Sequence, residues 1–176
     1  MAGEQQNTLA ALKTSIRMEI DGKEFYLKSS EASTNELGKQ LLKRLAEEED
    51  IHRQVFEKIY KNLGAEKGWP ESKVTFDSGK RLRTIFAKAT AAMAKNPAPI
   101  PSELDAVQKA MNIENETYDY YIKHAGLAAY PGEKTFYEEV AAQEKEHHRI
   151  LQDYYDFLTD PAAWHRVKER LSVDGG

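Results

Sequence analysis

The chain contains no cysteine among its 176 residues. This absence excludes disulfides, thiol catalysis, zinc and iron–sulfur sites held by cysteine, and a rubredoxin-like iron site. The first residues, MAGEQQNTLAALK, also lack the basic and then apolar segments of a secretory signal. We therefore expect a cytoplasmic protein.

Long apolar runs and an excess of positive charge are missing as well. No stretch approaches the roughly 20 apolar residues that a membrane-spanning helix needs, so we expect no membrane partner. The formal net charge is −4, which gives no basic footprint for nucleic acid. We therefore expect neither a lipid surface nor a nucleic acid as a partner.

The sequence instead contains helical periodicity along nearly its whole length. Hydrophobic residues make up 40% and charged residues 31%, which favours long helices with wide solvated faces. We predict one all-α domain over residues 1–176: a hairpin at 8–63, a crossover with a short helix at 64–101, a hairpin at 102–158 and a short C-terminal helix at 160–171. Two hairpins joined by one long crossover are typical of a ferritin-like four-helix bundle. Ser33 with Glu36 resembles a capping box before the second helix, and Asp160 is the expected N-cap of the last.

The two predicted hairpins repeat each other without a gap at an offset of 95 residues. The repeat pairs that carry polar atoms are Glu19 with Glu114, Tyr26 with Tyr121, Glu49 with Glu144, and His52 with His147. Such a repeat indicates two halves related by an approximate two-fold axis.

Each of these acidic and histidine residues lies in phase with the apolar stripe of its helix. Glu49 and His52 fill the gap between Leu45 and Phe56 in steps of four, three and four residues. The neighbouring acidic residues do not follow this phase, and we expect them on the solvated flank. These are Glu47, Glu48 and Asp50, whose repeat mates are Ala142, Gln143 and Lys145.

Burying four carboxylates together is untenable without positive charge. Two divalent ions would balance four carboxylates, and two neutral imidazoles would complete a donor set that suits iron(II) or manganese(II). One Glu from each of two helices and a Glu-x-x-His from each of the other two is the ligand set of di-iron carboxylate bundles. The predicted metal ligands are Glu19, Glu49, His52, Glu114, Glu144 and His147.

The segments MEIDGKEFY, LAEEEDIH, IENETYDYY and VAAQEKEH resemble the rubrerythrin branch of the ferritin-like superfamily. The resemblance extends over nearly the whole chain and implies two iron ions, with manganese or a mixed pair as alternatives. It implies that Glu49 and Glu144 bridge the metals. It further implies that Glu19 with His52, and Glu114 with His147, are terminal ligands.

Two departures from this family are visible. Many rubrerythrins have a further glutamate one turn after the third-helix ligand, where this chain has Thr117, the repeat mate of Gly22. Many also carry a C-terminal rubredoxin domain, which a chain without cysteine lacks. The resemblance therefore implies a nearly symmetric site that needs an external electron donor, such as a rubredoxin-like protein.

Two tyrosines are candidates for support of the ligands. Tyr26 and Tyr121 follow Glu19 and Glu114 by two turns, so their hydroxyls could either orient ligand carboxylates or be satisfied elsewhere in the core. We expect His124, His148 and His165 to be surface or packing residues, and Trp164 and Leu171 to pack in the last helix.

The function that this resemblance implies is reduction of hydrogen peroxide by a di-iron oxidoreductase, in a homodimer. Three alternatives remain open at this stage. They are iron oxidation and handling as in ferritins, an oxidase or oxygenase that uses oxygen on an organic substrate, and a metal-bound structural or sensor module.

Overall fold

The computed structural model describes residues 2–65, 67–70, 76–77, 79–92, 101–164 and 166. This part of the chain forms helices and contains no strand. The long helices are α1 (Ala2–Ala32), α2 (Glu36–Gly64), α4 (Pro101–Gly126) and α5 (Glu133–Thr159), and α3 (Lys80–Ala92) lies in the crossover. The predicted all-α bundle of two hairpins is therefore confirmed.

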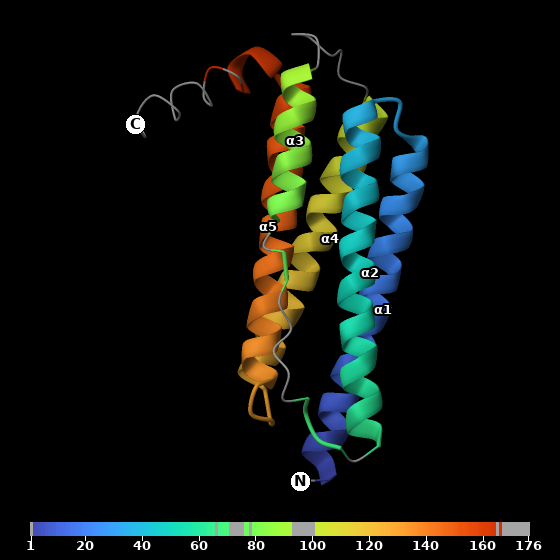
Figure 1. Ribbon diagram of the computed structural model, residues 1–176, viewed down its shortest axis with the longest axis vertical. Helices are drawn as coiled ribbons and strands as arrows, with labels where there is room; N and C mark the ends of the chain where they lie inside the picture. Colours follow the sequence, from blue (N-terminus) through green and yellow to red (C-terminus); the bar gives the residue numbers. More distant parts are fainter. Residues whose placement is uncertain are drawn as a thin grey trace.

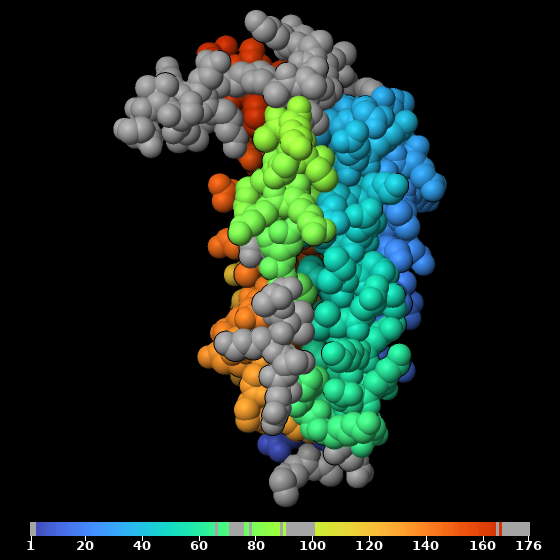
Figure 2. Space-filling view, in the orientation of Figure 1, coloured from blue at the N-terminus to red at the C-terminus, as the bar shows by residue number. Residues whose placement is uncertain are grey.

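The arrangement of the helices explains why the crossover is long. Helices α1 and α2 form one antiparallel pair and α4 and α5 form the other, and α1 also contacts α4. Because α2 and α4 run in the same direction, the chain between them must return along the bundle, and α3 forms part of that return (Figure 1). Helix α3 contacts both α2 and α5 and covers part of the groove between them (Figure 2).

The hydrophobic core falls into two clusters with the acidic and histidine residues between them. One cluster includes Leu45 and Leu151 with Leu82 and Phe86 of α3. The other includes Phe56, with Tyr121 and residues from the start of α5. The break in the apolar stripe of α2, between Leu45 and Phe56, is therefore also a break in the core. Among the described helices, none combines the length and the apolar character that crossing a membrane requires.

Two predicted helix starts have different outcomes. The cap of α2 is Asn35, whose side chain accepts from the Leu37 N–H, so the predicted capping box at Ser33 is wrong. The Ser33 hydroxyl instead donates to the Glu103 carboxylate at 2.7 Å. At the C-terminal end, Asp160 caps a short helix at 161–164 by accepting from the Ala163 N–H, as predicted.

Trp164, one of the two residues expected to pack in the C-terminal helix, packs against the bundle. The Trp164 ring lies edge-on to Phe86 and Phe157, with 5.5 Å between ring centroids in each pair. Position 165 and residues 167–171, which include Leu171, lie outside the described residues.

A buried polar cluster, which we call the turn network, joins the α1–α2 turn to α4 and α5. It consists of Ser33, Glu103 and Tyr154. The hydroxyls of Ser33 and Tyr154 both donate to Oε1 of Glu103. Gly38 leaves the space for this cluster, because a Cβ atom at that position would overlap all three side chains. Glu103 lies in the first turn of α4, where the helix dipole favours a carboxylate.

Candidate metal centre

The six predicted ligands meet between the two core clusters. Helix α1 contributes Glu19, α2 contributes Glu49 and His52, α4 contributes Glu114, and α5 contributes Glu144 and His147. All six side chains are buried, with at most 3% of any residue exposed. In each Glu-x-x-His pair the two residues are three apart, so both project from the same face of their helix.

The two histidines are related as the repeat implies. Their rings are stacked, with 5.7 Å between centroids and 12° between planes. Nδ1 of His52 lies 3.1 Å from a Glu144 oxygen and 3.5 Å from a Glu19 oxygen. Nδ1 of His147 lies 3.2 Å from a Glu49 oxygen and 3.5 Å from a Glu114 oxygen. In both rings it is therefore Nδ1 that faces the carboxylates.

The donor atoms divide into two overlapping groups. Within each group, one oxygen or nitrogen from every residue lies within 4.8 Å of the others. One group is Glu19, Glu49, His52 and Glu144, and the other is Glu49, Glu114, Glu144 and His147. Glu49 and Glu144 belong to both groups, as two carboxylates shared by neighbouring ions would.

The hydrogen bonding of these atoms tests whether a metal fits. Buried polar atoms nearly always have a hydrogen-bond partner. Here seven buried atoms that could bind a metal have no hydrogen-bond partner of acceptable geometry. They are Glu19 Oε2, Glu49 Oε1, His52 Nδ1, Glu114 Oε2, both oxygens of Glu144, and His147 Nδ1. These atoms belong to four carboxylates and two imidazoles and converge on one another. Such a set of ligand atoms fits two divalent cations.

The electrostatics show how closely these charges are packed. Burial, and then the charge of Glu144, raises the pKa of Glu49 well above its usual value. Burial also raises the pKa of Glu114. Burial alone would raise the pKa of Glu144, but the nearby imidazoles of His147 and His52 outweigh it and hold this pKa below the usual range. Like charges confined together thus push some of these carboxyl groups toward the protonated state unless cations are present.

The imidazoles respond to the same charges with the opposite sign. Burial alone would lower the pKa of His52, but the nearby Glu19 and Glu144 outweigh it and raise the pKa well above its usual value. The pKa of His147 is raised against burial in the same way, first by Glu114. In the absence of metal, protons on the two rings therefore offset part of the negative charge.

Tyr26 and Tyr121 both hydrogen-bond to carboxylates of the cluster, and they do so crosswise. The Tyr26 hydroxyl of α1 donates to Glu114 of α4, and the Tyr121 hydroxyl of α4 donates to Glu19 of α1. Burial, and then the neighbouring carboxylates, raises the pKa of both hydroxyls well above the usual value. Each tyrosine therefore keeps its proton and fixes one oxygen of a carboxylate, so the other oxygen can face the centre.

One residue of the centre was placed wrongly by sequence reasoning. Glu48 was expected on the solvated flank, but it is buried, with 4% exposed, and its Oε2 lies 3.0 Å from Nε2 of His147. Its other oxygen accepts from Arg44 at 3.1 Å. Sequence phase identified only the apolar face of α2, whereas Glu48 lies beside that face and points toward His147 of α5. Its distance of four residues from Arg44 was the signal that could have found a charge pair there.

The structure also tests what the sequence predicted for other polar residues near the centre. Glu47 is exposed and Asp50 half-buried, as expected for flank residues. Thr117, at the position of the further glutamate of many rubrerythrins, is buried and donates to backbone carbonyls of Ile113 and Glu114. His124 lies against the Tyr120 ring and His148 is half-buried, while His165 lies outside the described residues.

A buried group of four carboxylates and two histidines, drawn from the four long helices of a bundle, is the donor set of the class of ferritin-like metal proteins. A comparison with protein families agrees with this class and narrows it. The Rubrerythrin family model matches residues 10–155, so the chain belongs to the rubrerythrin family. No curated protein and no solved structure matches the chain.

Proposed function

We propose that this protein is a di-iron oxidoreductase that reduces hydrogen peroxide to water with electrons from an external donor. The observation that carries the proposal is the pair of buried donor groups that share Glu49 and Glu144. Two ions that share ligands lie close enough to act on both oxygens of one small substrate. Membership of the rubrerythrin family supports iron as the metal.

The reaction consumes one peroxide, two protons and two electrons and gives two water molecules. Two iron(II) ions in the centre would supply the two electrons, one from each ion. The donor must then return two electrons, and a rubredoxin-like protein is a suitable class because it carries one electron at a time. The chain cannot provide such a site itself, because it has no cysteine.

The side chains of the protein have three tasks in this proposal. The six ligands bind the ions, and Glu49 and Glu144 hold the two ions next to each other. Tyr26 and Tyr121 orient carboxylates by donating hydrogen bonds, and their raised pKa values make them poor proton sources. The core clusters on either side limit access of water and larger molecules.

An anaerobic iron(II) titration followed by mixing with peroxide or with oxygen tests the proposal. We expect two iron ions per chain, and oxidation by one equivalent of peroxide with the near-ultraviolet absorption of an oxo-bridged pair. Turnover should require an added reductant. A stoichiometry well below two would refute the dinuclear centre, and peroxide consumption no faster than with free iron would refute the enzyme.

The same experiment separates the alternatives. Faster oxidation by oxygen with growth of an iron mineral in a large shell would favour iron storage. An oxygen-dependent organic product would favour an oxidase or oxygenase. We also propose a homodimer in the cytoplasm. Sedimentation at several concentrations tests the dimer, and fractionation of cells tests the location.

A further inference from the structure

The two halves of the metal centre differ at one atom outside the ligands. Nε2 of His147, the ring nitrogen that faces away from the carboxylate cluster, lies 3.0 Å from Oε2 of Glu48. Glu48 is on α2 and His147 on α5, so this contact crosses from one hairpin to the other. Both side chains are at least 95% buried. The low dielectric of such a site strengthens a hydrogen bond to a charged group.

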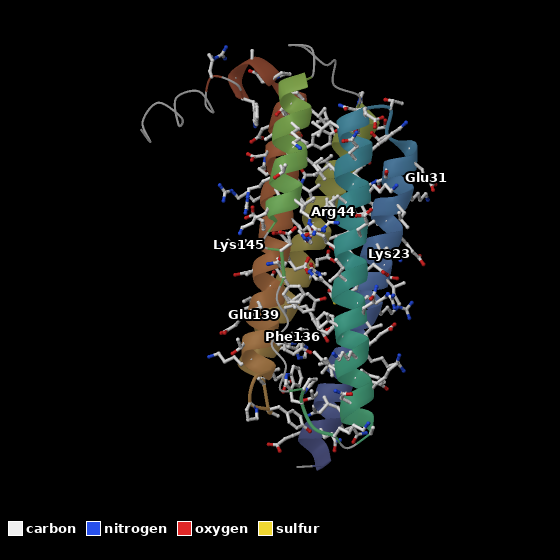
Figure 3. All side chains as sticks on the ribbon, viewed as in Figure 1. Lys23, Glu31, Arg44, Phe136, Glu139 and Lys145 are labelled. Atoms are coloured by element: carbon white, nitrogen blue, oxygen red, sulfur yellow. The ribbon has the colours of Figure 1, made fainter. Side chains whose placement is uncertain are left out.

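Arg44 holds Glu48 in this position. Its Nε donates to Oε1 of Glu48 at 3.1 Å, one helical turn away on α2, and its terminal nitrogen donates to Glu47 at 2.8 Å. In Figure 3 Arg44 extends from α2 toward the part of the bundle where α3 and α5 lie. A carboxylate paired with a guanidinium is ionised and can only accept. The hydrogen between Glu48 and His147 therefore belongs to the imidazole Nε2, which leaves the Nδ1 lone pair for a metal.

Among the residues that the structure describes, the equivalent ring in the other half has no carboxylate at its outer nitrogen. The repeat mate of Glu48 is Gln143, an amide that is also buried. In the described part of the chain no hydrogen bond joins Gln143 to His52. The His52 ring instead meets the edge of the Phe76 ring, with 5.2 Å between centroids. One imidazole is thus oriented by a carboxylate, whereas the other is oriented by packing.

We infer that Glu48 is a positioning residue for His147, and that it makes the half-site of Glu114 and His147 bind a divalent metal ion more tightly than the half-site of Glu19 and His52. A carboxylate on the far nitrogen fixes the tautomer and ring angle of a ligand histidine and raises its basicity. Loss of such a partner typically reduces metal affinity by about 10- to 100-fold. The inference rests on the dinuclear centre of the proposed function and adds an order of filling to it.

Titration of the metal-free protein with Co²⁺ tests this inference without any turnover. The d–d absorption reports each ion as it binds, and isothermal calorimetry gives the two affinities. The wild type should bind two Co²⁺ in steps whose affinities differ by about 10- to 100-fold. Glu48→Gln should weaken the tighter step by that factor and leave the other unchanged, so that the two steps merge. Its first Co²⁺ spectrum should also change.

Two further variants separate positioning from a general effect of charge. Glu47→Gln removes an acidic partner of the same arginine but has no contact with His147, so it should keep both steps. Gln143→Glu offers His52 a carboxylate and should strengthen the weaker step. Circular dichroism and thermal melting of the metal-free proteins would show that each variant is folded.

The outcomes distinguish this inference from the proposal on which it rests. Failure of the wild type to bind two Co²⁺ would overturn the dinuclear centre itself. Two Co²⁺ bound by Glu48→Gln with wild-type affinities and spectrum would overturn the role of Glu48 alone. Equal losses at both steps in Glu48→Gln and in Glu47→Gln would likewise refute a specific role at His147.

Discussion

Glu144→Gln should abolish most of the stabilisation that divalent metal gives to the folded protein. Glu144 is fully buried and belongs to both donor groups, and both of its oxygens lack a hydrogen-bond partner of acceptable geometry. The amide of glutamine keeps the volume but loses the charge and one of the two acceptor oxygens. Both half-sites should therefore weaken together.

The size of the effect follows from linkage. At a free metal concentration 100 times the weaker of the two dissociation constants, each site stabilises the native state by at least about 2.7 kcal/mol, and the two sites together by at least about 5.4 kcal/mol. For a domain of this size, 1 kcal/mol moves the melting temperature by about 2–4 °C, so Mn²⁺ should raise the melting temperature of the wild type by at least about 11–22 °C. In Glu144→Gln the shift should fall below about 4 °C.

The assay is differential scanning calorimetry of each protein with Mn²⁺ and with chelator. Comparing the metal-dependent shift within each variant removes any effect of the substitution on the metal-free fold. Glu138→Gln is a matched control, because it changes an exposed glutamate on the same helix. A shift in Glu144→Gln equal to that of the wild type would refute the idea that this carboxylate serves both ions.

Three other substitutions or conditions should give measurable effects. The raised pKa values of His52 and His147 leave protons on the metal-free rings, and that of Glu49 favours a proton on its carboxyl group. Metal binding should therefore release at least about one proton per ion and weaken as the pH falls. Calorimetry in buffers of different protonation enthalpy measures this release, and no release at pH 7 would contradict the prediction. Gly38→Ala should lower the unfolding free energy by about 1–3 kcal/mol in urea, because the new methyl group overlaps the turn network, and unchanged stability would refute this. Tyr121→Phe should reduce metal affinity by about 10-fold, because it removes only the hydroxyl that donates to Glu19; unchanged affinity would mean that this hydroxyl does not support the ligand.

Sequence periodicity could predict the bundle because its signal repeats in every turn of four long helices. The same periodicity could place Glu49 and His52 in the core, because both residues are in phase with the apolar face of α2. It could not place Glu48, because that residue lies off the apolar face of α2 and is nevertheless buried, with its carboxylate against His147 of α5. The burial of a flank residue depends on which neighbouring helix it faces, and one helix's own phase does not contain that information.

Sequence signals for the ends of helices were less reliable than periodicity, because they too depend on tertiary contacts. Ser33 and Glu36 have the spacing of a capping box, but Asn35 caps α2 while Ser33 bonds to Glu103 across the bundle. The hydroxyl thus has two alternative uses, and tertiary contact decides between them. The helix starts also differ, since α1 begins at Ala2, whereas periodicity becomes visible only near Thr8.

The centre also determines how the two hairpins depend on each other. Neither donor group lies within one hairpin, because each takes carboxylates or a histidine from both. The crosswise bonds of Tyr26 and Tyr121 join the same two halves, and so does the contact of Glu48 with His147. The core is divided at this level into two apolar clusters. The polar layer between them is therefore held by these bonds and, in the proposed function, by the cations that the centre would bind. Metal binding and docking of the hairpins should therefore be one cooperative event, in which the ions neutralise the charges that interrupt the core.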